Sequence, residues 1–288
     1  MVKIISDSTC DLSPELLKKY DIEILPLQII LGDTNHSDTV DITPDEIYRW
    51  SDQTKQSPKT AALNVWQIYE RLLPYEKETQ EVVLFSISES MSSTLSNMRS
   101  AVQMLDHPER MHVIDSANLS TGIGLLVIEA AIMAKQGCTA AEIIERIEAL
   151  KPHVRASFVV DTLTYLRRGG RCSGIEALAG SMLQLHPKII VQDGKMTVSK
   201  KYRGSIQKAI AAYVSDLQPQ LEKSKKNRVF ITHSGCSDEI LSQVNDQLES
   251  MHHFDEILVT RAGGVISSHC GPSTLGVLFI EEPEDPHT

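Results

Sequence analysis

The sequence predicts an α/β fold with two domains, and three observations support this class. Short segments rich in Val and Ile alternate with amphipathic segments along the 288 residues, which is typical of strands joined by helices in a largely parallel sheet. The chain is also long enough for two ordinary domains. Finally, Asp193-Gly194 separates two strand-like segments, and this pair predicts an antiparallel hairpin because both turn positions require a positive φ.

Nine segments have the composition and length of β-strands. They span residues 3–6, 22–31, 82–87, 112–115, 156–161, 188–191, 229–232, 256–260 and 275–280. The hairpin at Asp193-Gly194 joins 189–192 to 196–199. We therefore expect a mainly parallel sheet in the N-terminal domain and a mixed sheet, containing this antiparallel hairpin, in the C-terminal domain.

Capping residues mark the starts of several helices. Ser13 precedes a proline at the first helical position, and Thr43 and Thr139 each stand three residues before a glutamate, which is the spacing of a capping box. After Thr139, apolar residues recur at helical spacing and predict one buried face: Ile143, Ile144, Ile147 and Leu150. The break at Lys151-Pro152 predicts the domain boundary, so we expect domains over residues 1–152 and 153–288.

Composition and charge exclude several classes of protein. With 28 basic and 38 acidic residues the net charge is −10, which argues against a nucleic-acid-binding surface. The longest apolar run, 123–134, is shorter than the roughly twenty residues of a membrane span, and residues 1–11 do not resemble a signal peptide. Five cysteines without a CxxC pair indicate reduced thiols. We expect a cytoplasmic protein without stable membrane insertion.

A hydroxyl-rich segment, Ser86 to Thr94, follows a predicted strand and precedes a predicted helix. Free backbone amides and the positive end of the helix dipole make such a position suitable for an anion, and open α/β sheets bind ligands at this edge. Ordinary capping of the helix by Ser or Thr is the alternative. The residues by themselves leave both interpretations open.

Two further clusters offer polar side chains. Gly169 to Gly174 contains Arg171, whose forked donors suit a carboxylate or phosphate, unless the segment is a flexible turn with a solvated arginine. His269 either donates to an anion or is structural. A nucleophile made of Cys270 and His269 is disfavoured because adjacent side chains usually diverge. The sequence contains no phosphate-binding loop and no HExxH pair, so we expect neither a cofactor nor a metal.

Two predicted strands end in an Asp-Ser pair, at Asp7-Ser8 and at Asp115-Ser116. Two carboxylates at one sheet edge suggest a metal or acid–base site. We favour the simpler interpretation that these side chains cap the turns and helices that follow them.

Taken together, these motifs resemble the DegV family, the fatty-acid-binding (FakB-like) proteins of the bacterial fatty acid kinase system, nearly from end to end. The resembling segments occur in the order that the family shows: Asp7-Ser8-Thr9-Cys10-Asp11-Leu12, Pro26-Leu27, Asp38 to Asp41, Pro58-Lys59-Thr60, Ser92-Ser93-Thr94, 160–171, Asp193-Gly194 and His269-Cys270-Gly271-Pro272.

The resemblance implies a carrier, not an enzyme with its own turnover, with its ligand between two α/β domains. A long-chain fatty acid would lie in an enclosed apolar tunnel while a separate kinase phosphorylates its carboxylate, and the acyl phosphate would stay bound. The implied carboxylate site consists of Thr60, Ser92, Arg171 and His269, with Ser93 and Thr94 as additional contacts. By the same resemblance Arg203 would face the kinase. We expect a monomer.

The chain departs from the family pattern at several positions. Where the family reads T-S-Q-P, this chain has Thr60-Ala61-Ala62-Leu63, which loses two polar side chains. Ser93 replaces the glycine of L-S-G-T, and Cys172 and Ser273 replace an isoleucine and a glycine. We therefore expect a carboxylate network that is reduced or rearranged.

A serine-dependent acyl hydrolase or acyltransferase, using Ser92 or Ser93 with His269, is the alternative function. It requires a G-x-S-x-G elbow or a comparable nucleophile turn, and the sequence has neither. A small-molecule kinase or phosphatase would need a phosphate loop and metal motifs, which are also missing. The sequence therefore favours the lipid carrier.

Overall fold

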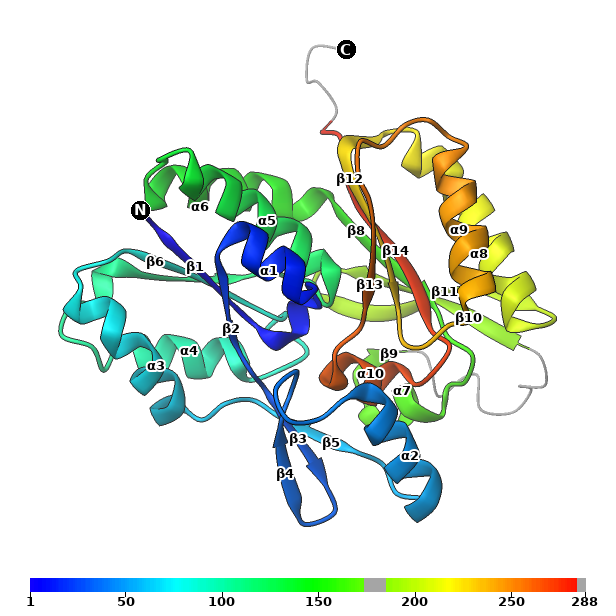
Figure 1. Cartoon of the computed structure of the whole chain (residues 1–288), viewed down its shortest axis with the longest axis horizontal. Helices are drawn as coiled ribbons and strands as arrows, with labels where there is room; N and C mark the ends of the chain where they lie inside the picture. Colours follow the sequence, from blue (N-terminus) through cyan, green and yellow to red (C-terminus); the bar gives the residue numbers. More distant parts are fainter. Residues whose placement is uncertain (174–184, 284–288) are drawn as a thin grey trace.

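The computed structural model describes residues 1–173 and 185–283, and it contains two α/β domains (Figure 1). The N-terminal domain is built on a four-stranded parallel sheet with the order β2-β1-β6-β7. Its strands are β1 (Lys3–Asp7), β2 (Ile22–Leu25), β6 (Val82–Ser86) and β7 (Met111–Asp115). The mainly parallel sheet expected from the alternation of strands and helices is confirmed.

Helices cover both faces of this sheet. They are α1 (Pro14–Tyr20), α3 (Val65–Lys77), α4 (Thr94–Val102), α5 (Thr121–Lys135) and α6 (Ala140–Leu150). Apolar side chains of α3 and α4 pack on one face with Ile5 and Leu84. Those of α1, α5 and α6 pack on the other face with Ile4 and Phe85, and the two groups lie on opposite sides of the sheet in Figure 1.

The C-terminal domain contains a seven-stranded mixed sheet with the order β13-β12-β14-β8-β10-β11-β9. Its strands are β8 (Val154–Val159), β9 (Cys172–Ser173), β10 (Leu185–Gln192), β11 (Lys195–Arg203), β12 (Ser224–His233), β13 (Ile257–Arg261) and β14 (Leu275–Glu281). The predicted hairpin is confirmed, because β10 and β11 are antiparallel and meet at Asp193 and Gly194, whose φ angles are 50° and 73°.

Helices also cover both faces of the second sheet. α8 (Ile206–Leu221) and α9 (Asp238–Glu249) pack on one face. The other face packs against α5, which therefore contributes to the cores of both domains. Two short helices, α7 (Thr164–Gly169) and α10 (Gly264–Cys270), lie next to each other near the junction of the domains.

A small antiparallel sheet, which the sequence analysis did not predict, extends from the N-terminal domain. It comprises β3 (Gln28–Leu31), β4 (Thr34–Ser37) and β5 (Lys59–Ala61), and α2 (Pro44–Thr54) accompanies it. The expectation of one strand over 22–31 is wrong, because Pro26 lacks an N–H group and β2 and β3 enter different sheets. We call residues 28–61 the lobe; its apolar core packs on Val265 of α10.

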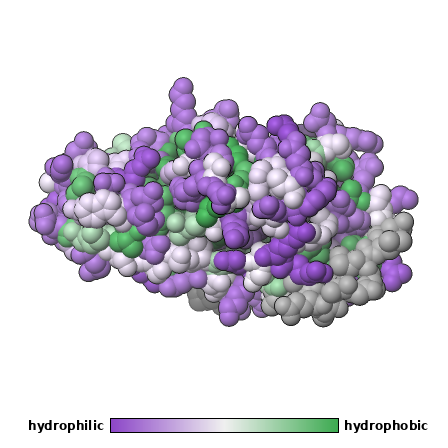
Figure 2. Space-filling model, turned by 90° about the horizontal axis from the view of Figure 1, so that it is seen from below, coloured by the Kyte–Doolittle hydropathy of each residue, from purple (hydrophilic) through white to green (hydrophobic). Residues whose placement is uncertain are grey.

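The predicted helix starts are confirmed. Ser13, Thr43 and Thr139 are N-caps, and the two threonines form complete capping boxes. The second sheet takes all its strands from Val154 onward, while the boundary at residue 152 stays a prediction. In the described ranges no helix is long and apolar enough to cross a bilayer. Figure 2 shows a face covered mostly by hydrophilic side chains, with hydrophobic residues in small groups.

Candidate functional site

A pocket lies where the two domains and the lobe meet. Its wall is formed by Leu27, Thr60, Ala61, Ala62, Ile87, Met91, Ser92, Ser93, Leu119, Arg171, Met196, Val265, Ile266, His269 and Cys270. The four residues of the predicted carboxylate site, Thr60, Ser92, Arg171 and His269, all lie on this wall. The fold thus brings together side chains that lie up to 209 positions apart in the sequence.

Thr60 and His269 join the lobe to the C-terminal domain. Thr60 Oγ1 in β5 lies 2.8 Å from Nε2 of His269, which is in the last turn of α10. His269 Nδ1 is buried and has no hydrogen-bond partner among the residues that the structure describes. A Cβ atom at Gly169 would lie 2.4 Å from this Nδ1, so the position requires glycine.

The Thr60–His269 pair has one hydrogen-bond donor that their mutual bond does not use. Burial, and after it the charge of Arg171, lowers the pKa of His269 to about 4, so the imidazole is neutral at pH 7 and carries one N–H. The pair therefore has two polar protons, one on each side chain, and its mutual bond uses only one. If His269 donates in that bond, the hydroxyl proton of Thr60 is left for a ligand; if Thr60 donates, the unused N–H is at Nδ1, which is buried beside Gly169.

Ser92 lies in the turn that leads into α4. Its Oγ accepts a hydrogen bond from Thr94 N at 3.2 Å and lies 2.8 Å from Thr94 Oγ1. The hydroxyl thus bonds to the first residue of α4 but does not cap the helix, because the N-cap is Ser93 and has no side-chain hydrogen bond; it also lies on the pocket wall. Ser93 is exposed, makes no side-chain cap and lies on the pocket wall, whereas Thr94 is buried and does not line the pocket. Because α4 begins here, the positive end of its dipole is close to the pocket.

Arg171 lies at the rim of the pocket and not in its interior. The side chain is exposed, and Nη1 donates to Gly169 O at 2.5 Å. A second, outward-facing pocket shares Thr60, Arg171 and His269 with the first and adds polar and basic residues: Ser57, Lys59, Tyr165, Arg168 and Ser268. The mouth of the site is therefore basic although the whole chain is acidic. Gly174, part of the same predicted cluster, lies outside the described residues.

An apolar pocket continues the site into the protein. It shares Leu119, Ile266 and Cys270 with the first pocket. Beyond these three, its wall includes Phe158, Ala262, Thr274, Gly276 and Leu278. The three pockets thus follow one another, from a basic mouth through a polar site to an apolar interior.

The remaining predicted residues have different surroundings. Ala61 and Ala62 lie on the pocket wall, so the departure from T-S-Q-P leaves methyl groups where the family has polar side chains. Ser273 has a φ of 59°, in the left-handed region where glycine is favoured, which explains the glycine of the family pattern. Arg203 is exposed at the end of β11 and is not part of the pocket wall.

Buried carboxylates form a cluster whose extent the sequence did not indicate. Asp7 caps the turn after β1, as predicted, by accepting from Thr9 N at 3.0 Å and also from Ile87 N at 2.8 Å. Burial raises the pKa of Asp7 to about 6 and that of Asp11 to about 8, and it also raises the pKa of Asp38. Asp11 and Asp38 contact α10, described below. Local sequence carries no signal for these contacts, because their partners lie more than 220 positions away.

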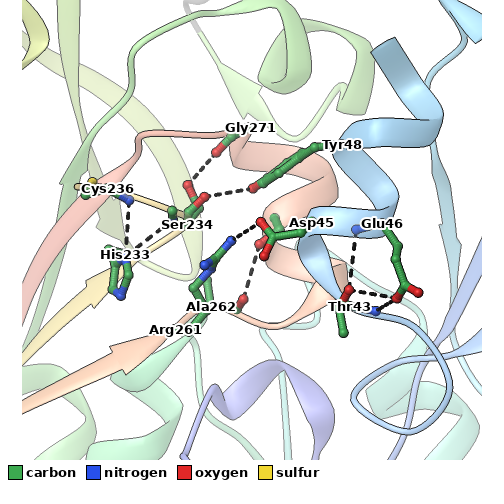
Figure 3. A network of polar contacts seen from close by, with 12 residues as sticks. Thr43, Asp45, Glu46, Tyr48, His233, Ser234, Cys236, Arg261, Ala262 and Gly271 are labelled. Carbon is green, nitrogen blue, oxygen red and sulfur yellow. Dashed lines mark hydrogen bonds and ion pairs between the residues drawn. The ribbon is translucent and has the colours of Figure 1, made fainter. Parts of the chain in front are cut away.

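A second set of contacts fastens α2 of the lobe to the C-terminal domain (Figure 3). Arg261 Nη2 pairs with Asp45 Oδ1 at 2.7 Å, and Tyr48 Oη donates to Ser234 O at 3.2 Å. Ser234 Oγ in turn donates to Gly271 O at 2.5 Å, next to the end of α10. Apart from Gly271, which belongs to the His269-Cys270-Gly271-Pro272 motif, these contacts were not identified from the sequence, because the residues belong to ordinary helices and strand ends.

Ser92 is not paired with His269, as the alternative acyl hydrolase would require. In the described ranges the bond of His269 Nε2 is to Thr60, and the hydroxyl of Ser92 is bonded to Thr94. Burial raises the pKa of the Cys270 thiol, which keeps it protonated and weakly nucleophilic. Within those same ranges no cluster of three or more His, Cys, Asp or Glu side chains suits a metal ion.

Comparison with known proteins identifies the family. The model of the DegV family of uncharacterised proteins matches residues 1–282. A DegV domain-containing protein of Caldanaerobacter subterraneus is 31% identical over 283 residues, which covers 98% of this chain and 99% of the relative. A fatty acid-binding protein of Thermotoga maritima is 29% identical over 281 residues and is matched over 96% of both chains.

Solved structures give the same result. A DegV family protein of Thermus thermophilus, described by its fatty acid binding, superposes with a TM-score of 0.90 at 27% identity, covering 98% of this chain and 99% of the other. A stearic acid-binding protein of Eubacterium ventriosum superposes with a TM-score of 0.85 at 28% identity, covering 98% of each chain. The chain belongs to the DegV family.

Proposed function

We propose that this DegV family protein binds one long-chain fatty acid, with the carboxylate at Thr60, Ser92, His269 and Arg171 and the acyl chain in the apolar interior. The observation that carries the proposal is the unused donor of the Thr60–His269 pair, which lies between a basic mouth and an apolar pocket. Fatty acid binding by similar proteins supports the same ligand.

The physical chemistry of the pockets suits such a ligand. Removing an acyl chain from water contributes about 0.8 kcal/mol per methylene, so the apolar interior supplies most of the affinity. A carboxylate that leaves water must find hydrogen-bond donors, or it takes up a proton instead. The Thr60–His269 pair and Ser92 offer such donors. Lys59, Arg168 and Arg171 at the mouth attract an anion that the net charge of −10 would otherwise repel.

We propose further that the protein is a cytoplasmic, monomeric carrier and not an enzyme. A separate fatty acid kinase would phosphorylate the bound carboxylate, and the outward-facing basic pocket has donors for the resulting acyl phosphate. Arg203, exposed at the end of β11, would contact the kinase. By itself, the protein should consume no ATP and hydrolyse no esters.

Native mass spectrometry of the purified chain tests the proposal. We expect a non-covalent extra mass of one long-chain fatty acid, identified after organic extraction, and a loss of this mass on delipidation. A clean apo mass, together with no binding of added palmitic acid to delipidated protein, would contradict the carrier function. Esterase turnover abolished by Ser92→Ala or Ser93→Ala would support the acyl hydrolase instead.

A further inference from the structure

The N-terminal half of the chain holds α10 at both ends, although α10 belongs to the C-terminal domain. At its last turn His269 meets Thr60 of the lobe. At its start, Asp11 Oδ1 accepts a hydrogen bond from Gly263 N at 2.8 Å, and Asp38 Oδ1 accepts one from Gly264 N at 2.7 Å. Two carboxylates from separate segments therefore bind two consecutive backbone amides.

The two carboxylates are themselves fixed by further hydrogen bonds. Ser120 Oγ donates to Asp11 Oδ2 at 2.5 Å, and Ser8 Oγ donates to Asp38 Oδ2 at 2.7 Å. Ser8 Oγ also accepts from Leu27 N at 3.1 Å, at the entry to the lobe. Asp11 and Asp38 are only 4% and 0% exposed. Every carboxylate oxygen thus has a partner, and three segments of the N-terminal half converge on the start of α10.

The start of α10 packs closely against these side chains of the N-terminal half. A Cβ atom on Gly264 would lie 2.4 Å from Ile29 Cδ1 and 2.9 Å from Asp38 Oδ1, and one on Gly263 would lie 3.1 Å from Asp11 Oδ1. α10 cannot slide or rotate without breaking both carboxylate bonds. Since five residue steps separate Gly264 from His269 in α10 and each rises about 1.5 Å, the two are about 8 Å apart along one rigid element.

A serine or asparagine cap would hold a helix start without the burial of two carboxyl groups. Among the described residues, neither Asp11 nor Asp38 pairs with a lysine, arginine or histidine, so their burial is costly. In return, two hydrogen bonds at adjacent backbone amides fix the direction of the helix as well as its distance.

We propose that Asp11 and Asp38 are positioning residues for the fatty acid head group, acting through α10 to keep the His269 imidazole in register with Thr60. This inference rests on the proposed function, because it concerns the same carboxylate site. Neither aspartate lies on the pocket wall, so any effect on the ligand must pass through the helix.

The test compares the affinities of delipidated variants for palmitic acid and for hexadecanol, which has the same chain but no charge. For Asp38→Ala and Asp11→Ala we expect about a tenfold loss for the acid and less than about a threefold loss for the alcohol. Asp45→Ala is the matched control: it also removes a contact between the lobe and the C-terminal domain, but not one at α10, and should leave both affinities within about twofold.

A second comparison shows whether the effect passes through His269. In a His269→Ala background, Asp38→Ala should change the acid affinity by less than about twofold, because the residue that it positions is already absent. An undiminished loss in that background, or equal losses for acid and alcohol, would overturn the proposal.

Asp11→Asn and Asp38→Asn, which keep the shape of the side chain, replace the alanine variants if those fail to fold. Nuclear magnetic resonance measures the pKa of the His269 ring, which a loss of stability alone would not change. We expect its pKa to rise toward 6.5 in the asparagine variants, and an unchanged titration would contradict positioning.

The binding data also separate failure of this inference from failure of the proposed function. If the wild type binds no palmitic acid, the proposed function fails. If the wild type binds it and all four aspartate variants bind it equally well, only this inference fails.

Discussion

Buried titratable side chains lie at both ends of α10, but the two ends differ in how far their hydrogen-bonding groups are satisfied. At the start of the helix, all four oxygens of Asp11 and Asp38 are bonded. At the last turn, His269 Nδ1 has no partner in the part of the chain that the structure describes. Unmet capacity in a buried site costs free energy unless a ligand meets it. The fully bonded start of α10 is therefore a scaffold, and under the proposed function the last turn is the end that meets the ligand.

The largest expected effect is a loss of stability on substitution of Gly264, at the start of α10. Gly264→Ala would place a methyl group within 2.4 Å of Ile29 Cδ1 and 2.8 Å of Ile47 Cδ1, and we expect it to lower the free energy of unfolding by about 2–3 kcal/mol. Gly263→Ala is the matched variant, since its closest contact would be 3.1 Å, and should cost about 1 kcal/mol. Urea denaturation measures both, and equal losses would show that the start of α10 is not tightly seated.

At the other end, Thr60→Val removes the hydroxyl and keeps the shape of the side chain. We expect the affinity for palmitic acid to fall about ten- to hundredfold, because hydrogen bonds to a charged acceptor contribute roughly 1.5–3 kcal/mol. Thr54→Val in α2 changes the same residue type in the same lobe, away from the pocket wall, and should leave binding unchanged. Isothermal titration calorimetry distinguishes the two; similar affinities would show that Thr60 does not contact the ligand.

The two ends also differ in how pH acts on stability. Asp11 has a pKa of about 8 in the folded protein against 3.8 as its ordinary value, so between these values the unfolded chain has lost a proton that the folded chain keeps, and stability falls as pH rises. His269 has the opposite sign: its pKa is lowered to about 4, so stability falls as pH decreases from 6.5 to 4.

Between pH 6.5 and 8 Asp11 changes the free energy of unfolding with pH, whereas His269 does not, because its titration lies below this window. We expect the free energy of unfolding to fall there by up to about 2 kcal/mol, since one proton corresponds to about 1.4 kcal/mol per pH unit. Urea denaturation across this window should give a flatter curve for Asp11→Asn than for the wild type. Parallel curves would mean that Asp11 is ionised in the folded state.

The features that were predicted correctly from the sequence are those that depend on interactions between neighbouring residues. The capping boxes at Thr43 and Thr139 and the turn at Asp193-Gly194 depend on neighbouring residues, and the structure has all three. The break at Pro26 is also a short-range effect. The sequence analysis nevertheless predicted one strand over 22–31, because the apolar pattern continues on both sides of the proline.

What the sequence could not reveal depends on long-range packing. The small sheet of the lobe is held by the core around Val265, more than 200 positions further along the chain. The bonds from Asp11 and Asp38 to Gly263 and Gly264 span 252 and 226 positions. The gathering of Thr60 and His269 on one wall was reached only through the resemblance to a family, since neither residue has a distinctive neighbourhood of its own.

A smaller effect is expected at Ser92. Its hydroxyl is already engaged with Thr94, so Ser92→Ala also weakens the start of α4, and we expect about a tenfold loss of palmitic acid affinity. Ser96→Ala in the same helix is the control, because Ser96 is exposed and bonds to the backbone. If hexadecanol binding falls as much as palmitic acid binding in Ser92→Ala, Ser92 shapes the pocket and does not contact the carboxylate.

The smallest effect is expected at Arg171. Its guanidinium is exposed and bonded to the backbone of its own loop, and exposed ion pairs contribute less than about 1 kcal/mol. Arg171→Ala should therefore reduce palmitic acid affinity by less than about fivefold, with a larger loss at low salt, because salt screens an exposed charge. A salt-independent loss of a hundredfold, measured by the same titration, would mean that the arginine turns inward and is buried beside the carboxylate when the ligand binds. The unused donor of the Thr60–His269 pair would then be a minor part of the head-group site.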